Sequence, residues 1–291
     1  MLLLDGKKVS DYELSKLEIE INKIKQSGGR VPHLAAVLVG NNPASVAYVN
    51  SKIKACARIG LTSSLVSLPE TISEIELTQK INELNDDASL DGYIVQLPLP
   101  KHINEQFILD KIAPEKDVDG FHPVNIGRMT LSLPCYLPAT PMGIIKILEY
   151  YKIETEGKHC VVVGRSHIVG TPISILLSRN EYPGNCTVTI AHSKTTDLKS
   201  ICRQADILIV ALGRPEFIDD SYIKEGCVVI DVGINRVEDT STKGYKIVGD
   251  VNFTSVKNKC SAITPVPGGV GPMTIISLLE NTLRANLKQI Y

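Results

Sequence analysis

Three polar side chains near the start of the sequence are spaced as they would be on one face of a helix. Ser45, Tyr48 and Lys52 are three and four residues apart, and side chains at these spacings are neighbours on an α-helix. A lysine in a partly desolvated site has its pKa lowered toward neutrality, which suits it to proton transfer beside a developing charge. A tyrosine one turn earlier can stack on a planar heterocycle. Taken singly, a helix lysine is more often a solvated surface residue.

Two further polar groups give this lysine a context. Gln96 stands at the end of the apolar run Gly92–Leu97, and Asp119 lies in the motif KDVDGFHP. Open α/β sheets bind ligands at the carboxyl ends of their strands and in the adjoining loops. Gln96 and Asp119 are therefore candidates for the same site as Lys52. The alternatives are a strand-terminating polar residue and an Asp-Gly turn, respectively.

A glycine-bearing turn follows a second apolar run. The run His159–Val163 leads into GRSHIVGTP, and Pro172 suits the first turn of a helix. Such a strand, turn and helix start place backbone N–H groups and a positive dipole end beside a diphosphate. The glycine spacing departs from GxGxxG, so a tight turn without a ligand remains the alternative for the motif alone.

The end of the next expected strand favours NADP over NAD. A Rossmann protein that prefers NAD places an Asp or Glu there, on the ribose 2′-hydroxyl. This sequence instead has His192, Ser193 and Lys194. The missing carboxylate, the hydroxyl of Ser193 and the cations Arg165 and Lys194 all favour a 2′-phosphate. Lys194 considered alone is a typical solvated loop lysine.

The elements that must position these residues form an α/β pattern. Apolar runs alternate with helical periodicity, as in parallel βαβ units. The first half predicts strands over 34–39, 64–68 and 92–97, with helices over 11–27, 43–59 and 73–87. The second half predicts strands over 159–163, 186–191, 207–212, 227–232 and 247–251, and a final helix over 273–288. The Pro- and Gly-rich stretch 112–141 is interpreted as a linker and cleft wall.

Composition narrows the class of protein. The length of 291 residues with 43% hydrophobic content favours two domains. The 31 basic and 32 acidic residues leave a net charge of −1, which argues against nucleic-acid binding. The run Leu2–Leu4 is too short for a signal peptide or membrane span. The seven cysteines form no CxxC pair, so we expect reduced core thiols in a cytosolic protein. We find no cluster with metal-ligand spacing and expect no metal.

Six segments closely resemble the bifunctional methylenetetrahydrofolate dehydrogenase/cyclohydrolases: ASVAYVNSKIKACARIG, DGYIVQLPLP, KDVDGFHPVNIGRM, PATPMGI, VVVGRSHIVGTP and ITPVPGGVGPMT. The match follows the family's order nearly end to end. It implies a cytoplasmic homodimer of two-lobed α/β monomers with a folate cleft between the lobes. Residues 1–141 and the returning C-terminal helix 273–291 would form the catalytic lobe, and residues 142–272 the Rossmann-like NADP-binding lobe.

The resemblance also implies residue roles. Tyr48 would stack on or orient the pterin, Lys52 would be the central catalytic residue, Gln96 would hold and tune Lys52, and Asp119 would hydrogen-bond the pterin edge. Further folate-side positions would be Leu97, Pro267, Gly268, Gly269 and Val270. The NADP site would comprise Gly164, Arg165, Ser166, Ile168, His192, Ser193, Gly213 and Ile234.

The implied reaction has two steps. A hydride leaves the one-carbon bridge of methylenetetrahydrofolate for the nicotinamide, and water then adds to the methenyl cation to give 10-formyltetrahydrofolate, with Lys52 managing the protons. Two alternatives come from other classes: a dehydrogenase of another small, shikimate-like acid, and a nucleotide sensor without catalysis. VQLPLP and PGGVGP argue against the first, and the second would not require Tyr48 and Lys52 on one helix face.

Overall fold

The chain divides into two compact units. The computed structural model describes residues 1–240 and 244–291. The first unit comprises residues 12–137 and 275–291, and the second comprises residues 1–11 and 138–274. We expected residues 1–11 in the catalytic lobe. They group with the second unit instead, because β1 (Leu2–Leu3) pairs with β11 (Ala262–Ile263).

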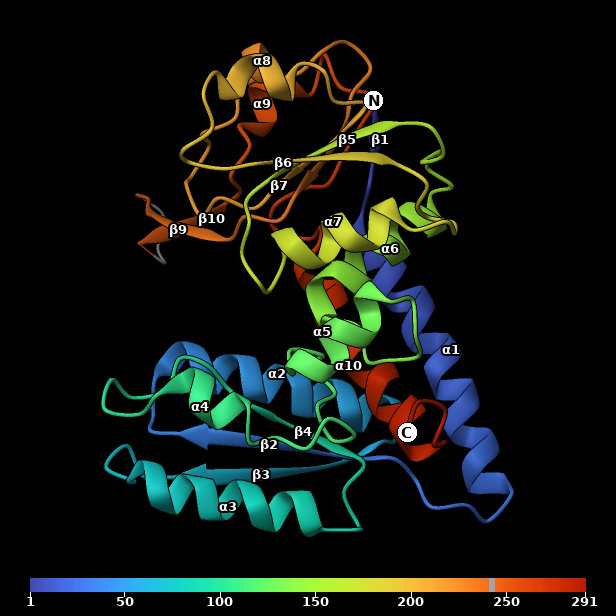
Figure 1. The fold of residues 1–291 in the computed structure, drawn as a ribbon, viewed down its shortest axis with the longest axis vertical. Helices are drawn as coiled ribbons and strands as arrows, with labels where there is room; N and C mark the ends of the chain where they lie inside the picture. The colour runs from blue at the N-terminus through green and yellow to red at the C-terminus, as the bar shows by residue number, and fades with distance from the viewer. Residues whose placement is uncertain (241–243) are drawn as a thin grey trace. The chain divides into compact units, whose positions relative to one another are not determined.

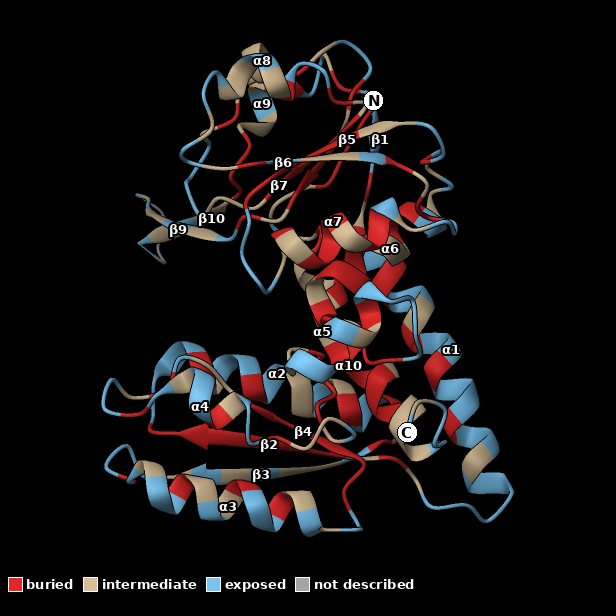
Figure 2. Ribbon diagram, viewed as in Figure 1, coloured by how far each residue is buried: buried red, intermediate tan, exposed pale blue. Residues whose placement is uncertain are grey.

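The first unit contains a three-stranded parallel sheet with the strand order β3-β2-β4. Its strands are β2 (His33–Val39), β3 (Thr62–Leu68) and β4 (Gly92–Val95). Helices α2 (Pro43–Ile59) and α3 (Glu74–Asp86) lie on opposite faces of this sheet (Figure 1). β2 and β4 are almost wholly buried, whereas the edge strand β3 alternates between half-buried and exposed positions (Figure 2).

The other helices associated with the first unit are α1 (Gly6–Gln26), α4 (Glu105–Leu109), α5 (Pro123–Thr130) and α10 (Gly271–Asn286). The division into units falls within α1 and within α10. The stretch 112–141, which we expected to be a linker, therefore contains a helix of its own. This helix was not predicted, because it is short and follows a polar segment. A ring nitrogen of His122 caps it, and Pro123 occupies its first position.

The second unit contains a six-stranded parallel sheet with the order β1-β11-β8-β7-β5-β6. Its longer strands are β5 (His159–Val163), β6 (Thr187–Ala191), β7 (Ile207–Val210) and β8 (Val228–Asp231). Helices α6 (Ala139–Tyr150) and α7 (Gly170–Ser178) lie on one face, with α8 (Leu198–Cys202) and α9 (Phe253–Val256) on the other (Figure 1). A one-turn 3-10 helix, η1, spans Asp220–Tyr222.

One predicted strand of the second unit is wrong. Residues 247–251 were expected to join the parallel series. Ile247 and Val248 instead end β10 (Tyr245–Val248), which forms an antiparallel pair with β9 (Asn235–Glu238). The run turns back at Gly249, because Asp231 accepts hydrogen bonds from the backbone of the next two residues. The parallel sheet continues with the two-residue strand β11, which is too short to show as a pattern.

In both sheets all strands are parallel, but the order in which the chain adds them reverses at one central strand. The chain runs from β2 to β3 on one side and later to β4 on the other, and it runs from β5 to β6 and later to β7 in the same way. Such reversals open a crevice at the carboxyl end of the central strand, where open α/β sheets bind ligands. The loops after β2 and β5 are therefore the places to look for chemistry.

Local signals explain why α2 and α3 begin where they do. Asn42 accepts hydrogen bonds from the backbone N–H groups of Ala44 and Ser45, Pro43 occupies the first helical position, and Gly60 closes the helix with a φ of +72°. Ser73 and Glu76 form a reciprocal capping box at the start of α3. The predicted bounds of the helix over 43–59 are therefore confirmed.

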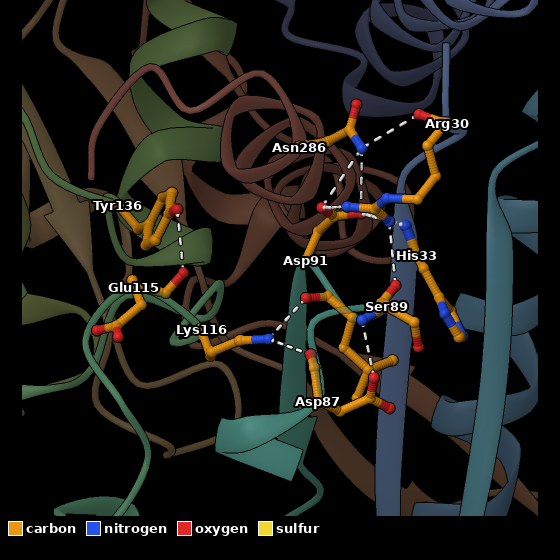
Figure 3. Close-up of polar contacts among 10 residues, drawn as sticks. Arg30, His33, Asp87, Ser89, Asp91, Glu115, Lys116, Tyr136 and Asn286 are labelled. Carbon is orange, nitrogen blue, oxygen red and sulfur yellow. Dashed lines mark hydrogen bonds and ion pairs between the residues drawn. The ribbon is translucent and has the colours of Figure 1, made fainter. Parts of the chain in front are cut away.

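A polar network fixes the C-terminal helix within the first unit (Figure 3). The buried carboxylate of Asp91 accepts hydrogen bonds from Nη1 of Arg30 at 2.9 Å, from the backbone of His33 and from Nδ2 of Asn286. Nδ2 of Asn281, on the same helix, donates to the carbonyls of Val118 and of residue 137. These bonds connect the C-terminal helix to segments 144 to 195 residues earlier.

All seven cysteines are free and buried, as the sequence predicted. Burial raises the pKa of the Cys56 and Cys202 thiols to about 12, which keeps them protonated and unreactive. Across residues 1–240 and 244–291 the structure has no helix long and apolar enough to span a membrane. The same residues contain no group of three or more His, Cys, Asp or Glu side chains that could bind a metal.

Candidate active site

Helix α2 brings a lysine to the end of β4. Nζ of Lys52 lies 3.3 Å from Oε1 of Gln96 and donates a hydrogen bond to it. The amide of Gln96 is held in turn, because its Nε2 donates to the carbonyl of Leu97 at 2.7 Å. One turn before the lysine, Tyr48 is 53% exposed, so its ring is open to a planar partner. Ser45, on the same face, is buried.

Asp119 lies beside the same lysine. Burial raises the pKa of its carboxyl above the usual value, and the positive charge of Lys52 opposes that rise. A backbone bridge pairs Asp117 with Tyr93 of β4 in the parallel sense. The chain turns directly after this bridge, since the backbone N–H of Gly120 donates to the carbonyl of Asp117 at 3.0 Å, and Asp119 lies in that turn next to β4. The close approach requires Gly92, because a Cβ there would lie 2.2 Å from a methyl group of Val118.

The loop that carries Asp119 is held by buried hydrogen bonds. Asp117 accepts from the backbone of His122 at 2.8 Å and from Nδ2 of Asn125 at 2.9 Å. Burial raises the pKa of Asp117 to about 7 although these bonds oppose the rise. Nζ of Lys116 donates to two carbonyls of the 87–90 turn (Figure 3). The position of Asp119 is thus fixed from both sides of the loop.

An open pocket of about 800 Å³ lies at the carboxyl end of the first unit's sheet. The loops after all three strands line it, and its polar groups come from Asn41, Asn42, Glu70, Thr71, Lys101 and His102. Pro98 of the pocket wall follows Gln96 by two residues. The pocket was not predicted, because it is formed by three loops that lie far apart in the sequence.

The turn after β5 has the geometry of a dinucleotide site. Gly164 has a φ of +135°, and a Cβ there would lie 2.3 Å from the carbonyl oxygen of Ala211 at the end of β7. Oγ of Ser166 accepts from the backbone of Val169. Pro172 stands in the first turn of α7, as predicted. Arg165, Ser166 and Ile168 are exposed around the helix start, where N–H groups and the dipole favour an anion.

Residues 192–196, directly after β6, carry no carboxylate, and the first one, Asp197, caps α8. Ser193 and Lys194 are exposed, and His192 is half-buried. Nδ1 of His192 accepts from the backbone of Lys194 at 3.2 Å, so that ring nitrogen closes its own turn. The chemistry of this segment fits a 2′-phosphate better than a free 2′-hydroxyl.

A smaller hollow lies in the second unit between the loop after β8 and the segment 265–272. Its volume is about 190 Å³, and Ile234 lines it together with Pro267, Gly268, Gly269 and Val270. The structure thus brings an expected cofactor residue next to the expected folate-side segment. Gly213, with a φ of +66°, and Ile234, 55% exposed, both lie at the carboxyl end of this sheet.

Two buried aspartates next to these loops were missed. Asp231 is 4% exposed and Asp250 is 0% exposed, and both accept several backbone hydrogen bonds. Burial raises the pKa of Asp231 to about 6. Their signal in the sequence is slight, an aspartate one or two residues from a glycine in DVGIN and VGDV.

Fold and geometry together define a class of protein: an α/β enzyme with one dinucleotide-binding unit and one unit that presents a lysine, an amide and a carboxylate. The family models agree. Residues 4–119 match the tetrahydrofolate dehydrogenase/cyclohydrolase catalytic domain, and residues 138–290 match the NAD(P)-binding domain of the same family. The chain belongs to the tetrahydrofolate dehydrogenase/cyclohydrolase family.

Relatives resemble the chain over its whole length. It is 63% identical to the bifunctional protein FolD of Flavobacterium johnsoniae over 286 residues, which cover 98% of this chain and 97% of that protein. The crystal structure of the bifunctional enzyme FolD, a methylenetetrahydrofolate dehydrogenase/cyclohydrolase, from Campylobacter jejuni is 48% identical, with a TM-score of 0.93 and 99% of each chain covered. The Trypanosoma brucei enzyme, solved with NADP and an inhibitor, is 36% identical, with a TM-score of 0.92, 100% of this chain and 98% of that chain covered.

The expected family and the α/β fold with an N-terminal catalytic and a C-terminal nucleotide-binding part are confirmed. The chain is a dehydrogenase and cyclohydrolase of tetrahydrofolate one-carbon units. This membership decides against both alternatives, a dehydrogenase of another small acid and a nucleotide sensor without catalysis. The roles of the individual site residues stay predictions.

Proposed function

We propose that this chain oxidises 5,10-methylenetetrahydrofolate with NADP and hydrolyses the methenyl product to 10-formyltetrahydrofolate at a site built around Lys52. The observation that carries the proposal is the contact of 3.3 Å between Nζ of Lys52 and Oε1 of Gln96, with Asp119 beside the same cation. A cation, an amide and a carboxylate together offer donors and acceptors to the edge of a pterin.

Each residue of this group has a distinct task. The exposed ring of Tyr48 stacks on the pterin or orients it, and Asp119 accepts hydrogen bonds from the pterin edge. Gln96 holds the lysine ammonium through its carbonyl, and its own amide is fixed on Leu97. On the other unit, Pro267, Gly268, Gly269 and Val270 shape the folate side of the hollow that Ile234 lines.

The second unit supplies the dinucleotide site. Gly164, Ser166 and Ile168 receive the diphosphate at the start of α7, and Gly213 and Ile234 flank the nicotinamide half. Arg165 and Ser193 hold the 2′-phosphate, for which the missing carboxylate directly after β6 leaves room, and His192 lines the same part of the site. When bound, NADP accepts the hydride from the one-carbon bridge.

The hydrolytic step is the task of this chain's own residues. Lys52 donates to Gln96, and its charge acts on Asp119; it manages the protons as water adds to the methenyl carbon and the ring opens. The dehydrogenase step needs positioning above all, because holding donor and acceptor carbons in near-attack contact contributes up to about 7–11 kcal/mol in well-oriented systems. The two steps therefore depend on Lys52 to different degrees.

One coupled assay tests the proposal. The purified chain is mixed with methylenetetrahydrofolate and either NADP or NAD, and the near-ultraviolet absorption of the methenyl product is followed. Added methenyltetrahydrofolate is then followed as it disappears without any dinucleotide. We expect both reactions, with NADP preferred. Absence of the second reaction in a folded, dehydrogenase-active chain would refute the hydrolytic half.

The proposal includes the compartment and the assembly, a cytoplasmic homodimer. Seven free thiols are typical of a reducing compartment. Within the described residues the edge strand β3 pairs with β2 alone, and Leu65 on it is 43% exposed. An edge strand of this kind can pair with a second copy. Light scattering of the purified chain gives the mass that decides between monomer and dimer.

A further inference from the structure

Asp250 is fully buried beneath the two segments that we propose to flank the nicotinamide half of NADP. It is 0% exposed, and its carboxylate accepts four hydrogen bonds. One oxygen accepts from the backbone N–H groups of Leu212 at 2.6 Å and Gly213 at 2.9 Å. The other accepts from the backbone of Arg214 at 2.9 Å and from Nδ2 of Asn235 at 2.8 Å. Four donors fill the acceptor capacity of an ionised carboxylate.

These four donors come from two loops far apart in the chain. Leu212, Gly213 and Arg214 follow β7, whereas Asn235 follows β8. Both loops leave the carboxyl end of the parallel sheet, where the strands are neighbours. Asp250 therefore ties one loop to the other, and it lies on a third segment that returns from the β9–β10 hairpin.

Asp231 holds the backbone of Asp250 in place through hydrogen bonds. Its carboxylate accepts from the backbone of Gly233 at 2.9 Å, of Asp250 at 3.0 Å and of Val251 at 3.0 Å. Its own backbone N–H donates to Oγ1 of Thr264, at the start of the segment that leads to the Pro/Gly hollow. The two carboxylates thus connect three chain segments of the second unit, and the backbone of Asp231 adds a fourth at Thr264.

Two glycines show how closely the carboxylates approach the backbone. A Cβ at Gly249 would lie 1.7 Å from Oδ2 of Asp231, and a Cβ at Gly233 would lie 2.5 Å from Oδ1 of Asp250. Neither glycine has a φ in the left-handed region. Glycine is therefore required at both positions because any side chain would collide with an aspartate, and not because of the backbone conformation.

We infer that Asp250 is a positioning residue for NADP: it fixes the Leu212–Arg214 loop and the Ile234–Asn235 segment against each other, and so sets the two edges that receive the nicotinamide half. It cannot touch the dinucleotide itself, since it is fully buried whereas Gly213 and Ile234 are exposed. The inference rests on the proposed cofactor roles of Gly213 and Ile234.

Asp250→Asn is the informative change. The side chain keeps its size, but an NH₂ group replaces one oxygen. If that group replaces Oδ2, it faces the two backbone N–H groups of Leu212 and Gly213 and both bonds are lost. If it replaces Oδ1, the bond from Arg214 is lost and the amide of Asn235 must turn over to accept. Charge-assisted hydrogen bonds are among the stronger ones in proteins, so their loss loosens both segments and we expect the Kd and the KM for NADP to rise about tenfold or more.

The control is Asp206→Asn. Asp206 also accepts a backbone hydrogen bond in the same sheet, from His159 at 2.8 Å, but at the amino end of the strands. It should leave NADP affinity unchanged. Calorimetric titration with NADP gives Kd, dehydrogenase kinetics give KM and kcat separately, and hydrolysis of methenyltetrahydrofolate without NADP reports on the first unit.

A positioning role predicts a raised KM for NADP with a smaller effect on kcat and an unchanged hydrolytic rate. A folded Asp250→Asn whose Kd for NADP stays within about twofold of the parent overturns the inference, as does a uniform fall of both activities. If Asp250→Asn does not fold, Asn235→Ala replaces it, because it removes the bond to Asp250 at 2.8 Å and, besides that, a long bond of 3.5 Å to the carbonyl of Val248; unchanged NADP affinity there also overturns the inference. Ser193→Asp distinguishes an error in the proposed cofactor site from an error in the role of Asp250. If Ser193→Asp leaves NADP binding unaltered, the proposed cofactor site is wrong. If Ser193→Asp weakens NADP binding but Asp250→Asn does not, only the role of Asp250 is refuted.

Discussion

Replacing Lys52 with methionine separates the two reactions. Methionine keeps the length of the side chain and removes its charge and its donors. The lost hydrogen bond to Gln96 is long, at 3.3 Å, so its removal costs about 1 kcal/mol or less in stability. General acid–base catalysis contributes about 10²–10⁴-fold, which corresponds to about 2.7–5.5 kcal/mol of transition-state stabilisation. We expect hydrolysis to fall by that factor and the dehydrogenase rate to stay measurable.

Lys54→Met is the matched control. It removes the same charge from the same helix, two residues away at an exposed position. Both reactions are followed by the methenyl absorption, from methylenetetrahydrofolate with NADP and from methenyltetrahydrofolate alone, with circular dichroism to establish folding. Equal losses of the two activities in a folded Lys52→Met chain, or an equal effect of Lys54→Met, would refute the division of labour.

Three further changes test other parts of the molecule. Asp119→Ala should weaken folate binding and leave NADP binding intact, since it removes an acceptor beside Lys52; a titration in which both affinities fall equally contradicts its place in the pterin site. Ser193→Asp should lower the ratio of kcat/KM for NADP to that for NAD by about tenfold or more, because a carboxylate repels the 2′-phosphate; an unchanged ratio means that the phosphate lies elsewhere. Asp117→Asn should flatten the pH dependence of stability. The folded-state pKa of Asp117 is raised from 3.8 to about 7, so the folded protein binds the extra proton and loses stability as pH rises through that window, by up to about 4 kcal/mol. Melting temperatures of parent and variant that run parallel between pH 4 and pH 7 argue against this.

The parts of the fold with strong local signals could be predicted. The bounds of α2 follow from Asn42, Pro43 and Gly60, and β5 was predicted at its observed residues. The failures lie where local pattern and tertiary role differ. β1 and β11 have two residues each, so no periodicity can reveal them. The run 247–251 has the composition of a buried strand, but its second half is diverted by Asp231.

The candidate site divides in a similar way. Helical spacing alone placed Tyr48 and Lys52 on one face. The partner of Lys52 is 44 residues away; its position at a strand end made Gln96 a candidate for the same site, but only the family resemblance predicted that it holds Lys52. Asp250 reaches backbone groups 36 to 38 residues earlier. Because those donors are main-chain atoms, no side-chain type at 212–214 marks them in the sequence.

The two ends of the chain are exchanged between the units, and this constrains folding during synthesis. The first unit is translated early, but its helix α10 and Tyr291 come last, and the hydroxyl of Tyr291 donates to Asn125, the residue that holds Asp117. At about 5–20 residues per second, the ribosome needs many seconds between the two segments. The second unit, in turn, waits for residue 262 before β1 finds its partner. The six-stranded sheet of the second unit therefore stays incomplete until β11 is translated, whereas the three strands of the first sheet, residues 33–95, are made early. A product that ends before α10 lacks the segment that completes the loop of Asp119.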